Sequence, residues 1–131
     1  MSKNWVKDIA DMHKKYGVQS KVSELDETSL GALLKFRLDF LAEEYNELCA
    51  ASLSRPVNAE ETVDALIDIL VVTIGALHSM GANAEGAWKE VMNTNFAKID
   101  KETGKVRKRE DGKVLKPAGW APPNLEPYLK K

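Results

Sequence analysis

Acidic residues gather in two short segments of the sequence, at spacings that could support chemistry if the segments are helical. The first segment, LAEEYNELCAA at residues 41–51, holds Glu43, Glu44 and Glu47 within about one helical turn. Like charges three or four residues apart destabilise an isolated helix. Either these glutamates form an ordinary solvated face or a cation between them removes the repulsion, and this segment alone leaves both interpretations open.

The second segment, ETVDALIDILVVTIGAL at residues 61–77, carries Glu61, Asp64 and Asp68 on a nearly apolar background. The spacing i, i+3, i+7 places all three on one stripe of a helix. Carboxylates on a mostly buried helix are costly unless they are paired or bind a metal, and aspartate is a poor residue in a helix interior. Glu61 has a simpler alternative explanation, as the acid of a capping box that begins at Asn58.

Two such helices, packed antiparallel through a short connection, would bring these carboxylates to a common site. Few cationic side chains are near in sequence: Lys35 and Arg37 precede the glutamates by about two turns, and Arg55 lies in the connection. Ligands that are all oxygen suit Mg²⁺ or Mn²⁺ rather than zinc. The sequence contains no Glu-x-x-His pair, GxxxxGK[ST] loop, HExxH or CxxC motif, which argues against the sites that those motifs build.

Composition places the chain among ordinary globular proteins. Of its 131 residues, 44% are hydrophobic and 30% are charged, and the net charge is -1. This balance favours neither nucleic acid nor membrane as a partner. Cys49 is the single cysteine, the N-terminal segment lacks the apolar core of a signal peptide, and Asp68 interrupts the apolar run at residues 65–72. We therefore expect a soluble, cytoplasmic protein.

Hydrophobic spacing predicts four helices that would position the acids. The first covers residues 5–16 and stops at Gly17, and the second runs from about residue 26 to residue 52. The third begins after Asn58 and ends near Gly81, and Asn83 caps a fourth helix that carries Trp88. The two long helices have apolar residues around most of their circumference, which requires burial. We therefore predict an all-α fold, a four-helix bundle whose core is completed by homo-oligomerisation.

The composition of the sequence changes after Phe96, and the remaining residues are rich in turn signals, basic residues and prolines. We divide the chain into a helical domain at residues 1–97 and a basic C-terminal arm at residues 98–131 that packs on it. Counted over the sequence, the arm carries a net charge of +5 and the remainder -6. The arm could form a small hairpin or irregular loops, followed by the extended proline-rich stretch PAGWAPPNLEPYL.

Isolated histidines and aromatic residues have simple structural explanations. We expect His13 at the edge of an amphipathic helix on the surface, and His78 as a surface residue at a helix C-terminus. Trp5, Tyr16 and Trp88 fit a core or an interface. We nevertheless consider Trp5 and His13 candidate substrate contacts. Cys49 is expected to be a packed, buried residue.

The acidic spacing resembles a known family pattern. EEYNE at residues 43–47, followed after thirteen residues by ETVD at residues 61–64, reads as EExxE…ExxD. This is the signature of the all-α nucleoside triphosphate pyrophosphohydrolase superfamily, which includes MazG-like proteins, dimeric dUTPases and phosphoribosyl-ATP pyrophosphohydrolases. The helix DALIDILVVTIGALHSMG and the region from VMNTNFAKID to NLEPYL are also similar to small members of this superfamily, so that the resemblance covers residues 10–128.

The resemblance implies a MazG-like catalytic domain that hydrolyses a nucleoside triphosphate to the monophosphate and pyrophosphate, with Mg²⁺ or, in its place, Mn²⁺. Carried over by position, Glu44 (or Glu43), Glu47, Glu61 and Asp64 are the metal-site acids, and Glu43, Glu44 and Glu47 the candidates for positioning water. Asp68 stands where some relatives have a phosphate-binding lysine, which suggests a further acid in the metal network. Asn95 and Lys98 match sugar and phosphate contacts, and Lys113 and Lys116 could close over the triphosphate.

The resemblance also implies a homodimer or a dimer-of-dimers tetramer. The reading that we rank first is an enzyme that removes unwanted nucleotides from the cellular pool. The alternatives are phosphoribosyl-ATP hydrolysis in histidine synthesis and a helical dimer that binds nucleotides without turnover. The base and sugar preferred, the number of metal ions and the phosphorus that water attacks are left open by the sequence.

Overall fold

The computed structural model describes residues 3–18 and 25–130 of the chain. Its elements are α1 (Trp5–Tyr16), α2 (Glu27–Leu53), α3 (Ala59–Ser79), α4 (Ala84–Phe96) and a short 3-10 helix, η2 (Glu126–Tyr128). The predicted all-α fold class is confirmed. Four α-helices are present, and the described residues contain no strand. Residues 19–24, between the first two predicted helices, lie outside the described residues.

Helix boundaries follow the capping residues. Gly17 ends α1 in the left-handed conformation with a φ of 72°, where the absence of a Cβ removes the steric cost. The side chain of Asp26 accepts a hydrogen bond from the Ser29 amide at the start of α2. Asn83 does the same for the Gly86 amide at the start of α4. These local bonds explain why α1, α2 and α4 begin and end close to the predicted positions.

The start of α3 departs in one detail from the capping box that we predicted. Asn58 Oδ1 accepts a hydrogen bond from the Glu61 amide at 3.0 Å, as expected. In a complete capping box the Glu61 side chain would accept a hydrogen bond from the Asn58 amide. Here this amide donates to the carbonyl of Ala51 instead. The carboxylate of Glu61 is therefore not needed for the cap.

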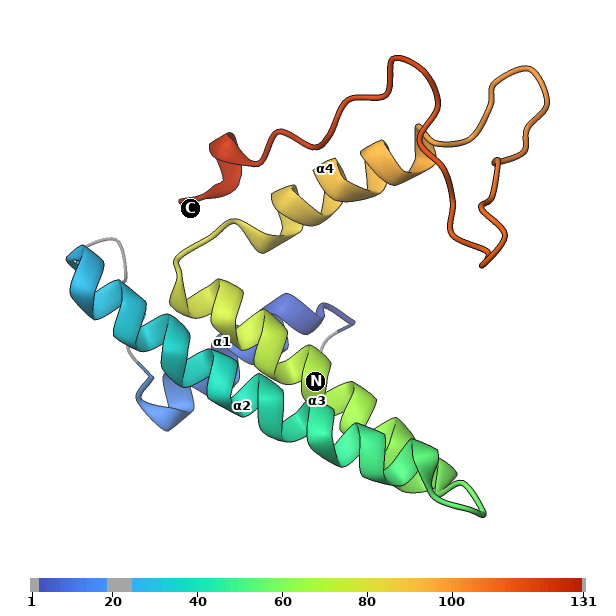
Figure 1. Cartoon of the computed structure of the whole chain (residues 1–131). Coiled ribbons are helices and arrows are strands. Elements are labelled where there is room, and N and C mark those ends of the chain that lie inside the picture. The colour runs from blue at the N-terminus through green and yellow to red at the C-terminus, as the bar shows by residue number, and fades with distance from the viewer. Residues whose placement is uncertain (1–2, 19–24, 131) are drawn as a thin grey trace.

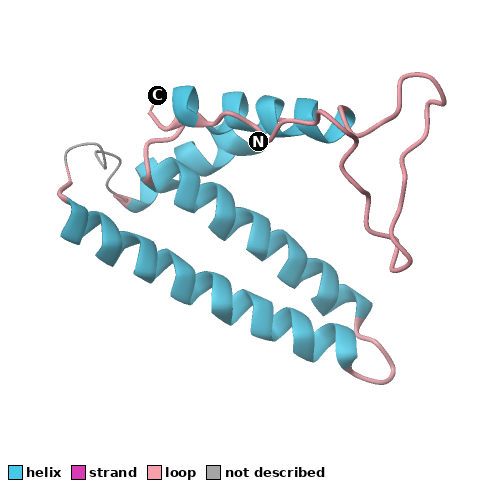
Figure 2. Ribbon diagram, turned by 45° about the horizontal axis from the view of Figure 1, so that its top comes forward, coloured by secondary structure: helices cyan, strands magenta, loops and turns pink. Residues whose placement is uncertain are grey.

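The long helices α2 and α3 form an antiparallel pair, joined by the short connection at residues 54–58 (Figures 1 and 2). Helix α1 packs against α3. Helix α4 starts beside the C-terminal end of α3 and diverges from the pair, and the C-terminal segment runs back along α4 (Figures 1 and 2). The molecule thus has two parts that meet near residues 80–83.

The C-terminal arm is fastened to α4. Trp120 Nε1 donates to the Thr94 carbonyl at 2.7 Å, and the Asn124 amide donates to a Glu90 carboxylate oxygen at 3.1 Å. The arm holds an isolated antiparallel bridge between Lys108 and Val114. Of the two forms that we considered for this region, the structure has the irregular one, with η2 as an additional turn.

The hydrophobic core of a single chain is small. The buried apolar side chains among the described residues are Ile9, Ala51, Ala65, Ala82 and Ala84. Large apolar side chains on α2 and α3 remain exposed in the single chain. Helix α3 is long and apolar enough to cross a membrane by length and composition, with a mean hydropathy of 1.6, but the core helices of soluble proteins meet the same criterion.

Candidate active site

Glu44 is the centre of the carboxylate cluster. It is half-buried on α2, and burial raises the pKa of its carboxyl group. The negative charges of Glu47, Asp68 and Asp64 raise the pKa further, in that order. These shifts identify Glu44, Glu47, Asp64 and Asp68 as electrostatic neighbours across the α2–α3 pair. Glu44 of α2 therefore lies near Asp64 and Asp68 of α3.

One carboxylate oxygen of Glu44 lacks a hydrogen-bond donor. Glu44 Oε2 is buried and has no hydrogen-bond partner among the described residues. A buried carboxylate oxygen without a donor is costly, and the neighbouring carboxylates cannot donate while they are ionised. The side chains that share this site thus leave an acceptor for a ligand to satisfy.

The other two predicted acids are exposed to solvent. Glu43 and Glu61 are exposed, and neither contributes to the pKa shift of Glu44. Among residues 3–18 and 25–130, no three His, Cys, Asp or Glu side chains lie close enough together to hold a metal ion as they stand. The donor set is nevertheless the all-oxygen set that Mg²⁺ and Mn²⁺ prefer. Glu47 and Asp64 are exposed side chains on the same pair of helices.

A second cluster, which we call the cationic cluster, lies at the end of α4. Lys98 Nζ and Lys116 Nζ stand 5.4 Å and 5.0 Å from the centre of the Trp120 ring. Lys98 Nζ also donates to Asn95 Oδ1 at 3.1 Å. The structure therefore gathers three of the predicted substrate contacts, Asn95, Lys98 and Lys116, around a tryptophan that sequence reasoning did not assign to the site.

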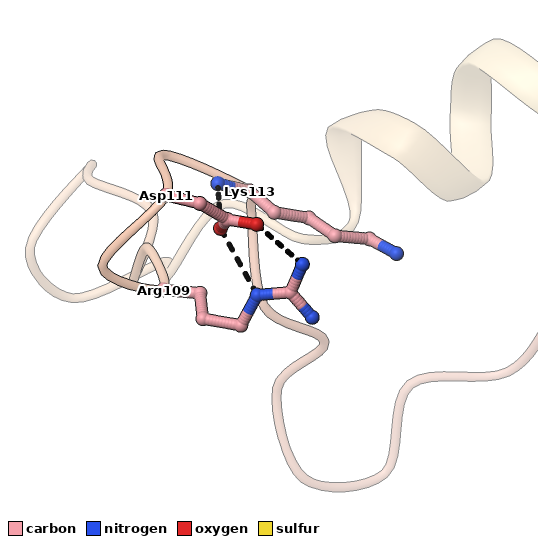
Figure 3. Close-up of polar contacts among 3 residues, drawn as sticks. All are labelled: Arg109, Asp111 and Lys113. Carbon is pink, nitrogen blue, oxygen red and sulfur yellow. Dashed lines mark hydrogen bonds and ion pairs between the residues drawn. The ribbon is translucent and has the colours of Figure 1, made fainter.

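Lys113, the fourth predicted contact of this group, lies in a separate turn at residues 109–113. Asp111 accepts two hydrogen bonds from the Arg109 guanidinium and one from the Lys113 amide (Figure 3). The Lys113 side chain extends away from this carboxylate (Figure 3). Asp111 therefore pairs with Arg109 and orders the turn, and the ammonium group of Lys113 is not part of that ion pair.

A groove between α1 and α3 holds the predicted contact Trp5. It has a volume of about 710 Å³ and is lined mainly by apolar side chains, with Trp5, Met12 and Tyr16 on one wall and Ile67 and Val71 on the other. Ile67 directly precedes Asp68, so that the groove runs beside the acidic stripe of α3. Its size and apolar lining suit a planar organic ring.

His13 is not on the surface, and our expectation for it was wrong. Its side chain is only 3% exposed, and its ring lies edge-on to that of His78 with the ring centres 5.0 Å apart. Gly75 allows this approach, since a Cβ there would lie 3.0 Å from His13 Nε2. Burial, Arg37 and His78 all lower the pKa of His13. His13 thus belongs to the α1–α3 contact and does not line the groove.

Arg37 and Ser79 complete this buried polar group. Arg37 Nη2 donates to Ser79 Oγ at 2.9 Å, and Ser79 is fully buried. Neither residue was predicted, because their roles depend on contacts between α2 and α3 that are 42 residues apart in the chain. The sequence did contain one indication of such a contact, because Arg37 is a cation on a predominantly apolar helix.

Comparison with known proteins identifies the family of the chain. The family model of phosphoribosyl-ATP pyrophosphohydrolases matches residues 16–95, more than half of the chain, while a comparison with curated proteins gives no match. The matched range contains all four acids of the coupled cluster and Asn95. It begins at the last residue of α1 and stops before Lys98. The chain belongs to the phosphoribosyl-ATP pyrophosphohydrolase family, within the MazG-like all-α superfamily of soluble pyrophosphohydrolases.

Proposed function

We propose that this protein is a Mg²⁺-dependent nucleoside triphosphate pyrophosphohydrolase, which converts a (d)NTP and water to the (d)NMP and pyrophosphate. The observation that carries the proposal is the cluster around Glu44, in which Glu47, Asp64 and Asp68 raise its pKa and Oε2 has no donor. Such a concentration of negative charge repels a triphosphate unless cations lie between them. The cluster is therefore suited to binding the substrate together with divalent ions.

Glu44, Glu47, Asp64 and Asp68 would hold the ion, and Glu61 would join them by a change of side-chain rotamer at the start of α3. A divalent cation bound there would neutralise phosphate oxygens and make the phosphorus more susceptible to attack. Glu47 is exposed and adjacent to Glu44, so it can accept a proton from the attacking water. Glu43, on the exposed side, is left as a solvated residue.

Two further parts of the molecule would bind the rest of the substrate. The cationic cluster of Lys98, Lys116 and Asn95 provides donors for the phosphates and the sugar. The groove beside the acidic stripe provides apolar surface for the base, with Trp5 as its aromatic contact. The lining is mainly apolar, with Asp8, Asp11 and Lys15 as its charged residues. Apolar contact discriminates weakly between similar bases, so we further propose action on a group of nucleotides and a role in clearing the nucleotide pool.

We also propose that the protein works as a homo-oligomer in the cytoplasm. The single chain exposes 10127 Å², whereas a compact monomer of 14.5 kDa exposes about 6,900 Å². Part of this excess belongs to the extended arm, but its size is in the range that obligate dimers bury. The exposed apolar side chains of α2 and α3 offer the matching surface.

Phosphoribosyl-ATP hydrolysis is the second candidate, because the matching family model carries that name. Its substrate is also cleaved to a monophosphate and pyrophosphate, so the carboxylate cluster serves both reactions equally. Complementation of a strain that lacks this step of histidine synthesis separates the two: growth without histidine would favour phosphoribosyl-ATP as the substrate. A third candidate, nucleotide binding without turnover, predicts binding in the absence of metal and no pyrophosphate release.

The decisive experiment measures pyrophosphate released from a panel of canonical and modified NTPs with Mg²⁺ or Mn²⁺. We expect release from at least one nucleotide, and none after metal removal by EDTA. The variants Glu47→Gln and Asp64→Asn should keep the helical circular dichroism spectrum but lose activity. Activity that persists in EDTA would contradict the proposal, as would the absence of turnover with every nucleotide and both metals.

A further inference from the structure

The indole group of Trp120 completes the C-terminal end of α4. The carbonyls of the last four residues of a helix have no partner inside it. In α4 three of these carbonyls accept hydrogen bonds from the amides that follow, and the pairs are Asn93 with Ala97, Asn95 with Lys98 and Phe96 with Ile99. The fourth carbonyl, that of Thr94, accepts from Trp120 Nε1 at 2.7 Å. Trp120 therefore supplies the one bond that the backbone after α4 does not make.

The backbone before Trp120 is a tight turn that fixes the residue from the other side. The Trp120 amide donates to the Pro117 carbonyl at 3.1 Å. Gly119, the third residue of the turn, has a φ of 77°, a conformation that glycine adopts without steric cost. The position of the indole ring is thus determined both by its own backbone and by its bond to α4.

Two lysines from different segments approach this one ring. Lys98 follows α4 by two residues, and Lys116 precedes Trp120 by four. Their Nζ atoms stand 5.4 Å and 5.0 Å from the ring centre. The face of an indole ring carries partial negative charge and attracts ammonium groups, more strongly than the ring of phenylalanine or tyrosine does. Trp120 thereby brings together two cations that would otherwise repel each other.

The indole ring attracts these cations without carrying a net charge of its own. Among the described residues, no ion pair involves Lys98 or Lys116. Arg109 in the neighbouring turn is different, because it is paired with the carboxylate of Asp111. A carboxylate at the position of Trp120 would cancel one of the two positive charges. With tryptophan there, both charges stay available for an anionic ligand.

We propose that Trp120 is the positioning residue of the cationic cluster: its ring holds Lys98 and Lys116 near one another, without neutralising them, to bind the polyphosphate chain of the substrate. This inference rests on the proposed function and adds how the phosphate contacts are held in place. A polyphosphate fits such a pair because it accepts hydrogen bonds from both ammonium groups at once. Lysines that are already held lose less side-chain freedom on binding, which raises the affinity.

The first test measures binding of inorganic tripolyphosphate, which has the phosphate chain of a nucleotide but neither base nor sugar. Calorimetric titrations at low salt, without divalent metal, compare the wild type with Trp120→Met and Trp120→Phe. We expect the wild type to bind and Trp120→Met, which keeps apolar volume but loses the aromatic face, to bind about tenfold more weakly. Trp120→Phe keeps an aromatic face and should lie nearer to the wild type.

The phenylalanine variant separates positioning of the lysines from a merely structural role. If Trp120 only fastens the arm through its bond to Thr94, both variants lose that bond and should bind equally weakly. Equal losses would therefore overturn the proposal. Undiminished binding by Trp120→Met would also overturn it, and so would a wild-type protein that does not bind tripolyphosphate.

Two controls test whether the effect of Trp120 passes through the lysines. Trp88 is 68% exposed on α4, and Trp88→Met makes the same chemical change with an effect on affinity within about twofold. In a Lys98→Met/Lys116→Met background, adding Trp120→Met should weaken tripolyphosphate binding no further, because the groups that the ring holds are gone. Losses that add in full would show that Trp120 acts independently of the lysines.

Turnover connects this role to the proposed reaction. For a nucleotide that releases pyrophosphate, Trp120→Met should raise KM by about tenfold and leave kcat within about threefold, since the carboxylates around Glu44 are unchanged. A loss confined to kcat would overturn the proposal. A wild-type protein that binds tripolyphosphate as expected but turns over no nucleotide would refute the proposed function and leave the positioning role of Trp120 standing.

Discussion

Neighbouring glutamates on α2 show how strongly position along a helix determines the chemistry of a carboxyl group. Glu43 and Glu44 are identical in type and adjacent in sequence, but one turns to solvent and the other faces three acids. The raised pKa of Glu44 results from burial and from those like charges. The spacing left the choice between Glu43 and Glu44 open, and we propose Glu44 as the residue that binds a cation.

The first prediction compares Glu44→Gln with Glu43→Gln. We expect Glu44→Gln to lower the rate of pyrophosphate release by about 100-fold or more, because it removes a charged oxygen from the centre of the cluster. Glu43→Gln, the same chemical change one residue away, should stay within about threefold of wild type, as expected for a solvated residue. Initial rates at saturating Mg²⁺ measure both. Equal losses in the two variants would contradict the assignment.

The second prediction concerns His13. Because its pKa is lowered in the folded state, the unfolded chain binds the proton more readily between that value and about 6.5. The contribution of His13 to stability is therefore complete above pH 6.5 and is lost as the pH falls through that window, by at most about 1.4 kcal/mol per pH unit. The groups that face it, Arg37 from α2 and His78 from α3, oppose its protonation.

Urea unfolding at pH 7.5 and pH 5.5, at one protein concentration, measures this effect. His13→Gln should show a smaller loss of unfolding free energy on acidification than the wild type. Glu44 acts in the opposite direction, because its raised pKa favours the folded state as the pH falls toward 4.5. That contribution is common to both proteins and cancels in the comparison. An equal pH dependence in the two proteins would show that His13 is not the group responsible.

At the scale of elements, the sequence predicted what is determined locally. Asn58 and Asn83 cap α3 and α4, and Gly17 terminates α1, because each uses bonds or conformations within a few residues. The burial of His13 and the bond from Arg37 to Ser79 were missed, since they arise only when three helices come together. The acidic spacing predicted two helices whose acids would lie near one another. It left the choice between Glu43 and Glu44 open, and it included Glu61, which does not contribute to the pKa shift of Glu44.

The third prediction tests the contact between η2 and α4. Gly86 is required there, because an added Cβ would lie 2.5 Å from a ring carbon of Tyr128. Gly86→Ala should displace the ring and reduce the unfolding free energy by about 1–3 kcal/mol, despite the better helix propensity of alanine. It should also speed proteolysis of the arm. Gly31→Ala is the control, since nothing lies within 4 Å of its added Cβ, and it should raise stability by up to about 1 kcal/mol.

At the scale of the whole molecule, the small core of a single chain is the reason why we propose association. With a few buried alanines and one buried isoleucine among the described residues, a single chain has little apolar burial with which to offset the entropy of ordering its backbone. The exposed stripe on α3 that Val63 and Leu66 form provides the missing burial only when another chain covers it. Folding and association would then be one process.

The fourth prediction is that Leu66→Glu separates the chains and lowers their stability together. Leu66 lies in the exposed stripe of α3, so a buried, unpaired carboxylate there would oppose association strongly. Analytical ultracentrifugation should show a shift toward monomer, and the melting temperature should fall and lose the dependence on protein concentration that we expect for the wild-type oligomer. Asn93→Glu adds the same charge to an exposed position of α4 and should leave both measurements unchanged. A Leu66→Glu protein that remains dimeric and equally stable would show that this stripe is not the surface between the chains.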